Sequence, residues 1–313
     1  MAKKIRGNAV YLERYTPGYD YVSAWGSPEA FARHIASQDR KKCWHDAGWE
    51  YGEEWSGSKS MDESLEMAAN GWPKGATTVS KIRDRVLAQN PIRKQPIKYG
   101  IAGSTPNVPR AISGNPLSMR ADEYGRNKRK PVITLICNMS ANCGVESGTI
   151  NNRAAALTAL IDQIEVRGYC VEVVATATSY RGNFKAVTSV VVKQSHQPAD
   201  IGRLAFGLGQ ASMFRRLVFA DWGSSEECRA LDRGLGHSGN DAILEGDGSH
   251  MIFKVPSAEG VTKYFKDEDT TATEGVKYLT DYLRSQDCPC FPKMTKEEKE
   301  AFAPAKPKFA IDW

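Results

Sequence analysis

The strongest constraint on the fold is the run of residues 132–137, in which only Thr134 is polar. Such a run is typical of a strand that is buried on both faces of a sheet. Residues 150–166 then place apolar side chains at helical spacing, and residues 169–177 form a second apolar run. A strand, a helix and a strand of these lengths predict a βαβ unit with parallel strands and a right-handed crossover.

The pattern continues toward the C-terminus. After a turn at Arg181, Gly182 and Asn183, the next elements are predicted as a strand over 184–193, helices over 198–209 and 211–219, a strand over 251–255 and a helix over 271–284. The strand at 184–193 is expected to be antiparallel and to lie at an edge. The sequence therefore predicts a doubly wound, mostly parallel α/β domain over residues 131–288, followed by a tail over 289–313.

Residues 1–90 are predicted to form a separate small helical domain. Ser27 and Pro28 suit the start of one helix, and Ser60 suits the start of another that ends before Gly71. A third helix is predicted over 77–89. Five of the seven tryptophans lie in this stretch, and a domain this small would use most of them as core. Residues 131–313 are then expected to fold alone.

Residues 91–130 are predicted to form a basic connector. Five prolines and four glycines exclude long regular elements, although short strands remain compatible with the pattern. Nine basic residues stand against Asp122 and Glu123, which leaves a net charge of +7 in this stretch, compared with +5 for the whole chain. The basic residues are Arg93, Lys94, Lys98, Arg110, Arg120, Arg126, Lys128, Arg129 and Lys130.

This charge asymmetry favours a polyanionic partner, and we expect single-stranded DNA. Tyr99, Trp44 and Trp49 are the aromatic residues expected to stack on bases, because every base offers a π-face. Two interpretations stay open beside this one. The basic stretch can be a solvated surface that only keeps the protein soluble, and the tryptophans can be core residues.

Several function classes find no support in the sequence. The apolar runs are too short to cross a membrane, and the opening residues lack the apolar stretch of a signal peptide. Seven cysteines without a repeating pair indicate reduced thiols, so a cytoplasmic location is expected. The thiols of Cys288 and Cys290 are spaced too closely for a zinc ribbon.

No catalytic residue, metal, cofactor or small-molecule substrate is predicted. The chain has no Walker A lysine motif and no nucleophile elbow. The glycines of residues 234–239 neither follow a strand nor open a helix, so they do not indicate a nucleotide site. A hydrolytic metal site built from His237, His250, Asp241 and Asp247 is the weaker alternative.

The second half of the chain resembles the von Willebrand factor A fold, on the strength of a buried strand, a polar loop at 138–142 and a long helix. The resemblance implies a metal motif in this loop, where the family has Asp-x-Ser-x-Ser. Here Asn138 replaces the aspartate and Asn142 replaces the second serine, while Ser140 is retained. An amide supplies no charge to a hard divalent cation, so we expect a degenerate motif that holds no metal.

Residues 55–60, 63–68 and 70–75, together with residues 153–156, are similar to an uncharacterised family of tailed phages and prophages. The resemblance extends to the single-stranded-DNA-binding transcription activator of schitovirus-type podophages. It implies a phage accessory protein in the cytoplasm of the infected host that recruits a phage-encoded RNA polymerase to promoters. The alternative is a von Willebrand A-like protein-interaction module that partners an AAA+ ATPase and binds no nucleic acid.

Overall fold

The computed structural model describes residues 4–7, 19–38, 52–89, 99–102, 105–120, 131–141, 144–231, 237–238, 250–259 and 261–302. The chain divides into two compact units. One combines Met1–Gln89 with Pro131–Trp313 and is called the α/β unit here. The other is Asn90–Lys130 and is called the basic unit.

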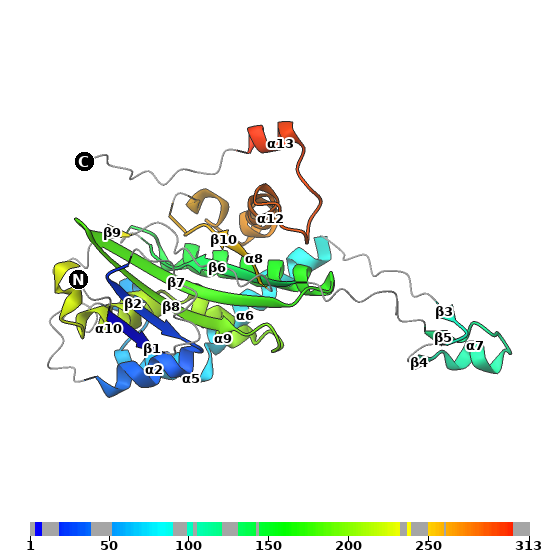
Figure 1. Ribbon diagram of the computed structural model, residues 1–313, viewed down its shortest axis with the longest axis horizontal. Coiled ribbons are helices and arrows are strands. Elements are labelled where there is room, and N and C mark those ends of the chain that lie inside the picture. The colour runs from blue at the N-terminus through cyan, green and yellow to red at the C-terminus, as the bar shows by residue number, and fades with distance from the viewer. Residues whose placement is uncertain are drawn as a thin grey trace. The chain divides into compact units, whose positions relative to one another are not determined.

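A mixed sheet forms the centre of the α/β unit (Figure 1). Its strand order is β1-β2-β8-β7-β6-β10, and the short β9 also pairs with β7. The strands are β1 (Lys4–Gly7), β2 (Tyr21–Trp25), β6 (Val132–Asn138), β7 (Val171–Arg181), β8 (Phe184–Lys193), β9 (His237–Ser238) and β10 (His250–Val255). β6 runs parallel to β7 and β10, whereas β7 and β8 form an antiparallel hairpin. The α/β class and the parallel βαβ unit are confirmed.

The sheet also contains two strands from the N-terminal segment. β2 pairs in parallel with β8, with Val22 opposite Val187, and β1 pairs in parallel with β2. β8 is therefore an interior strand, and the expectation that it lies at an edge is wrong. Because β2 supplies backbone hydrogen-bonding groups to β8, the N-terminal segment contributes β1 and β2 to the same sheet.

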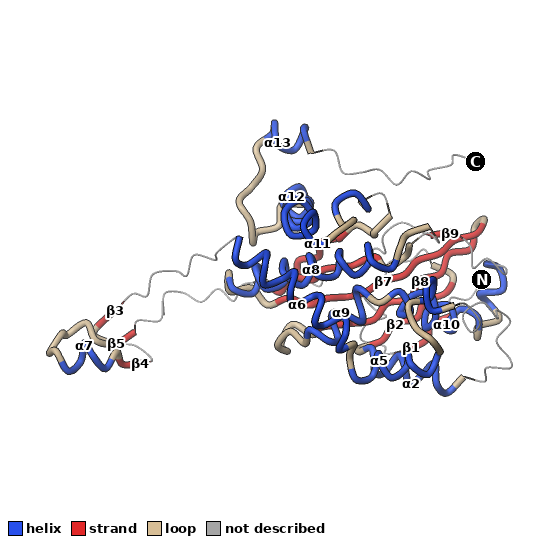
Figure 2. Tube along the Cα trace, turned by 180° about the vertical axis from the view of Figure 1, so that it is seen from behind, coloured by secondary structure: helices blue, strands red, loops and turns tan. Residues whose placement is uncertain are grey.

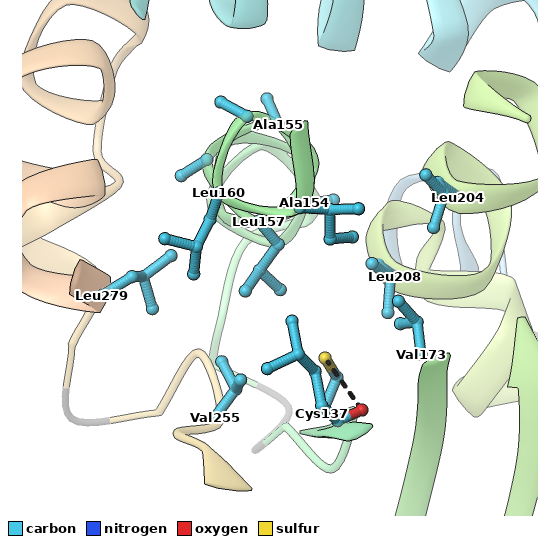
Figure 3. Close-up of a cluster of buried hydrophobic side chains, with 14 of the residues drawn as sticks. Cys137, Ala154, Ala155, Leu157, Leu160, Val173, Leu204, Leu208, Val255 and Leu279 are labelled. Carbon is cyan, nitrogen blue, oxygen red and sulfur yellow. Dashed lines mark hydrogen bonds between the residues drawn. The ribbon is translucent and has the colours of Figure 1, made fainter. Parts of the chain in front are cut away.

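The described helices cover one face of this sheet, as the opposite views of Figures 1 and 2 show. The prediction of a doubly wound sheet, which needs helices on both faces, is therefore not confirmed by the described residues. The longer ones are α2 (Pro28–Ser37), α5 (Met61–Asn70), α6 (Pro73–Gln89), α8 (Ser147–Val166), α9 (Ile201–Gly209) and α12 (Val276–Ser285). Shorter ones are α4 (Glu53–Ser56), η2 (Met213–Val218), α10 (Phe219–Gly223), η3 (Glu227–Leu231), η4 (Thr262–Tyr264), α11 (Glu268–Thr270), η5 (Thr271–Gly275) and α13 (Lys296–Ala301). Leu157 and Leu160 of α8 point into the core beside Cys137 and Val255 (Figure 3).

The N-terminal helices do not form a domain of their own. Val79, Ile82 and Val86 of α6 belong to the same buried cluster as Leu157. Phe31 and Ile35 of α2 belong to a second cluster with Leu217 and Trp222. The prediction of a separate Trp-rich domain over residues 1–90 is wrong, because these helices pack on the α/β elements as well as on one another and share their buried clusters.

The local signals for the helix ends are confirmed. The Ser27 hydroxyl accepts a hydrogen bond from Ala30 N at 3.1 Å, and the Ser60 hydroxyl accepts one from Glu63 N at 3.1 Å. Gly71 ends α5 with a φ of 84°, a value that favours glycine. These caps satisfy backbone N–H groups that a helix start leaves without a partner.

The C-terminal segment is packed as far as residue 302. Arg284 contacts Glu298 at 3.1 Å, and Lys299 contacts Asp287 at 2.8 Å, so α13 is joined to the end of α12. The Phe302 ring lies 5.8 Å from the Tyr278 ring, measured between centroids. The predicted tail over 289–313 is therefore wrong for residues 289–302; residues 303–313 lie outside the described residues.

The basic unit contains only short elements, as its prolines and glycines predict. These are β3 (Tyr99–Gly100), β4 (Thr105–Pro106), β5 (Met119–Arg120) and α7 (Val108–Ile112). The strands are antiparallel in the order β3-β5-β4. The Asn107 side chain caps α7 by accepting a hydrogen bond from Arg110 N at 3.2 Å. The stretch is thus a small folded unit, where the sequence predicted a connector.

Candidate functional site

Two of the predicted nucleic-acid-binding residues meet in the basic unit. The Arg110 guanidinium carbon lies 4.1 Å from the centre of the Tyr99 ring, a cation–π contact. The Asn107 amide donates a hydrogen bond to the Tyr99 hydroxyl at 3.0 Å, and Arg110 Nη1 donates one to Leu117 O at 3.4 Å. Tyr99 is half-buried and Arg110 is exposed. A planar aromatic ring and a planar cation are therefore held together on β3 and α7.

The same unit exposes large apolar side chains. Ile101 is 80% exposed and Ile112 is 82% exposed, and Val108 and Leu117 are exposed as well. Scattered apolar side chains are ordinary on a protein surface, but four within so short a stretch are more typical of a binding surface. They can contact bases or a protein partner.

The other predicted contact residues are not brought together by described structure. Only the backbone of Arg120 is described, in β5. The rest lie outside the described residues: Arg93, Lys94, Lys98, Arg126, Lys128, Arg129, Lys130, Trp44 and Trp49.

The degenerate metal motif is a closed hydrogen-bonded turn at the end of β6. Ser140 N donates to Asn138 Oδ1 at 2.9 Å. The Ser140 hydroxyl donates to Thr178 O at 3.1 Å and accepts from Thr178 N at 2.9 Å. Both side chains are buried, with Ser140 only 1% exposed. Asn142 lies outside the described residues. The turn therefore uses the Ser140 hydroxyl to join β6 to β7.

Arg153 of α8 places a cation at this strand end. Its Nε donates to Pro256 O at 2.9 Å, and its Nη2 donates to Asn138 O at 3.2 Å. The side chain is 1% exposed. The guanidinium thus bridges the ends of β6 and β10, where its charge opposes the approach of a second cation. In the sequence, residue 153 stood out only as part of a family motif. Its buried position could have been inferred, because it is a single arginine within an otherwise apolar helix.

We expect that restoring the family motif will not create a magnesium site. In a chain carrying Asn138→Asp and Asn142→Ser, the new carboxylate is on the residue whose backbone carbonyl accepts from Arg153, and the nearby guanidinium charge competes with an added cation. Calorimetry with magnesium chloride should detect no micromolar binding by this variant. Adding Arg153→Met removes the competing cation and provides the matched comparison. Micromolar affinity while Arg153 is still present would contradict the expected competition.

A second polar cluster lies around Asp221 of α10, which is fully buried. The Tyr21 hydroxyl donates to its Oδ1 at 2.9 Å, and the Thr188 hydroxyl donates to its Oδ2 at 3.0 Å. Arg6 Nη1 lies 3.7 Å from the same Oδ1. His34 Nε2 lies 3.3 Å from it without hydrogen-bond geometry. One carboxylate therefore gathers side chains from β1, β2, α2 and β8.

The chemistry of this cluster favours a structural contribution. Burial, followed by the Asp221 charge, raises the pKa of Tyr21 well above its ordinary value of 10.0. Burial also raises the pKa of the neighbouring Cys228 thiol. A protonated phenol and a protonated thiol are poor nucleophiles at neutral pH. The partners of Asp221 are distant in the sequence, so this cluster leaves no local signal there.

The weaker metal hypothesis gains nothing from the described residues. His250 Nδ1 lies 2.8 Å from the Thr134 hydroxyl and 3.7 Å from Glu172 Oε1. Within the described ranges, no three His, Cys, Asp or Glu side chains gather closely enough to hold a metal ion. Asp241 and Asp247 lie outside them.

Among the helices described, none is both long and apolar enough to span a bilayer.

Comparison with known proteins identifies a family without an assigned activity. No curated protein and no solved structure matches the chain. A family model described as a domain of unknown function (DUF7192) matches residues 6–288. This range includes the basic unit and nearly all described elements of the α/β unit. The chain therefore belongs to the DUF7192 family.

Proposed function

We propose that this protein binds single-stranded nucleic acid, DNA in the first place, through the basic unit. It recruits a phage-encoded RNA polymerase to promoters, with the α/β unit holding the polymerase. In this proposal the protein acts in the cytoplasm of an infected host cell and performs no catalysis.

The observation that carries the proposal is the confinement of positive charge to one compact unit. Residues 90–130 hold nine basic and two acidic side chains, a net charge of +7, whereas the whole chain has +5. The α/β unit is therefore slightly acidic. Each lysine or arginine that meets a phosphate releases condensed counterions, which is the main source of sequence-independent affinity.

The Tyr99–Arg110 pair supports a preference for single strands. Unpaired bases can stack on an aromatic ring or on a guanidinium plane, and duplex DNA keeps its bases covered. Ile101 and Ile112, both exposed, offer further apolar contact to an unstacked base.

The α/β unit suits a partner-holding function. We propose that it is a von Willebrand A-like domain, which agrees with its order of a long helix, a parallel strand, an antiparallel strand and a helix. The hydrogen-bonded turn at Asn138 and Ser140, with the buried Arg153 beside it, supports recognition without a metal ion.

Fluorescence anisotropy with labelled single-stranded DNA, duplex DNA and RNA, measured over a range of salt concentrations, tests the proposal. Affinity for single strands should fall with salt at a log–log slope of about −0.7 per phosphate contact. Changing Arg126, Lys128, Arg129 and Lys130 together to alanine should flatten that slope by about two to three units. Tyr99→Ala should weaken single-strand binding by roughly 1–3 kcal/mol.

A control with equal charge loss uses four exposed lysines of the α/β unit, changed together to alanine: Lys266, Lys277, Lys293 and Lys296. Its slope should match the wild type. If both variants lose the same slope, binding is a diffuse property of net charge. Absence of binding to any nucleic acid at low salt would sink the proposal. The alternative is then favoured: a protein-interaction module for an AAA+ ATPase, using the exposed apolar side chains of the basic unit.

A further inference from the structure

Two cysteines occupy one tight turn after α12. Phe291 N donates to Cys288 O at 3.3 Å, so residues 288–291 form a turn with Cys288 first and Cys290 third. Just before it, Asp287 has a φ of 59°, in the left-handed region that non-glycine residues rarely adopt. A turn brings its first and third residues close, within reach of the roughly 4.4–6.8 Å Cα separation that a disulfide needs.

The turn holds both thiols beneath an exposed proline. Cys288 is 3% exposed and Cys290 is 6% exposed, and both are reduced. The intervening Pro289 is exposed, and its carbonyl accepts a hydrogen bond from the Tyr169 hydroxyl at 3.2 Å. The turn therefore lies at the surface, while its two thiols are covered.

The two thiols are chemically unequal. A hydrogen bond from the Cys290 thiol lowers the pKa of Cys288. The same contact, together with burial, raises the pKa of Cys290. Cys288 is therefore the nucleophile of the pair, because the thiolate is the reactive form. Cys290 is placed to react with it next.

We propose that Cys288 and Cys290 are a redox site at which a small hydroperoxide, such as hydrogen peroxide, closes an intrachain disulfide. The Cys288 thiolate, whose proton has passed to solvent, attacks one oxygen of hydrogen peroxide. The O–O bond breaks, Cys288 becomes a sulfenic acid, and the departing hydroxide takes up a proton to become the first water. The Cys290 sulfur then attacks the Cys288 sulfur, the S–O bond breaks, and hydroxide leaves with the Cys290 proton as water. The dithiol loses two electrons and two protons, and the peroxide is reduced to two waters.

The position of the turn gives the disulfide a structural consequence. The turn leads from α12 to α13, and Asp287 directly before it contacts Lys299 at 2.8 Å. Arg284 of α12 donates to Pro292 O at 2.9 Å, directly after the turn. The disulfide would therefore close between two contacts that join α12 to the segment leading into α13.

The test treats the reduced full-length protein with hydrogen peroxide, alkylates the remaining thiols and analyses peptides under non-reducing conditions. The peptide containing both cysteines should be unalkylated and lighter by two hydrogens, and dithiothreitol should restore both alkylation sites. This reaction should proceed on the order of ten times faster than oxidation of the exposed Cys170, because of the thiolate character of Cys288.

Two variants separate the steps. Cys170→Ser should leave the closure rate unchanged. Cys290→Ser should form no disulfide and should instead accumulate a sulfenic acid at Cys288 that dimedone traps. In the wild type, a pair that stays alkylatable while Cys170 is oxidised overturns the proposal. Accumulation of sulfinic acid at Cys288 without loss of the two hydrogens also overturns it.

Discussion

A chain that begins at Pro131 is expected not to fold. Without the N-terminal segment, β8 loses its partner β2, and its backbone groups on that edge lose their hydrogen bonds. The two cores also lose buried apolar side chains. These are Tyr21, Phe31, Ile35, Met61, Met67, Val79, Ile82 and Val86. At roughly 1.5–3 kcal/mol for each of the eight, their loss is as large as or larger than the total stability of about 5–15 kcal/mol that most domains have.

The matched control removes the basic unit instead. Replacing residues 90–130 by a glycine–serine linker of equal length keeps every element of the α/β unit, which is compact by itself. Circular dichroism and urea unfolding should show a cooperative transition for this chain. Residues 131–313 should precipitate or show no cooperative transition. A stable, cooperatively unfolding 131–313 fragment would restore the two-domain interpretation of the sequence.

The strand–helix–strand centre could be predicted because its signals are local. The run at 132–137 is long enough and apolar enough to identify β6, and the predicted bounds of β8 agree with the structure. The caps of α2 and α5 depend on residues three positions apart. Neighbouring residues carry all of this information, so a single sequence suffices.

The N-terminal strands could not be predicted because their signals are distant. β2 has only five residues, and its polar Ser23 and short length resemble a loop. What makes it a strand is pairing with β8, more than 160 residues later. The separate domain was predicted from helix signals that were themselves correct, since an apolar helix face does not show which element covers it.

The candidate sites were also predictable only where their signals are local in the sequence. The absence of the family's aspartate was visible at Asn138, but the cation beside it was not, because Arg153 reaches it from the following helix. The Tyr99–Arg110 contact spans only eleven residues, yet it depends on the turn of α7 rather than on spacing. Both contacts depend on which side chains the folded chain brings together and buries. The pattern of residue types along the sequence contains little of that information.

Asp221→Ala is expected to be among the most destabilising single substitutions. The carboxylate is fully buried and holds the Tyr21 and Thr188 hydroxyls at 2.9 and 3.0 Å, with Arg6 at 3.7 Å. Removing one partner of a buried charged network leaves the others desolvated and unsatisfied, which costs about 3–5 kcal/mol. The loss should act first on the N-terminal segment, because two of these partners lie on β1 and β2.

Two further variants distinguish this explanation from a general effect of mutation. Asp221→Asn keeps the shape and one acceptor oxygen, so its cost should be smaller, roughly 1–3 kcal/mol. Glu226→Ala removes a carboxylate that is 84% exposed and only 3.8 Å from Arg229, and it should change nothing measurable. Urea titration gives the free energy of unfolding of each of the three variants. Tryptophan fluorescence is a suitable signal, because Trp222 donates a hydrogen bond to the Thr188 hydroxyl at 2.9 Å. If Asp221→Ala lies within about 1 kcal/mol of the wild type, the buried carboxylate does not hold the N-terminal strands on the sheet.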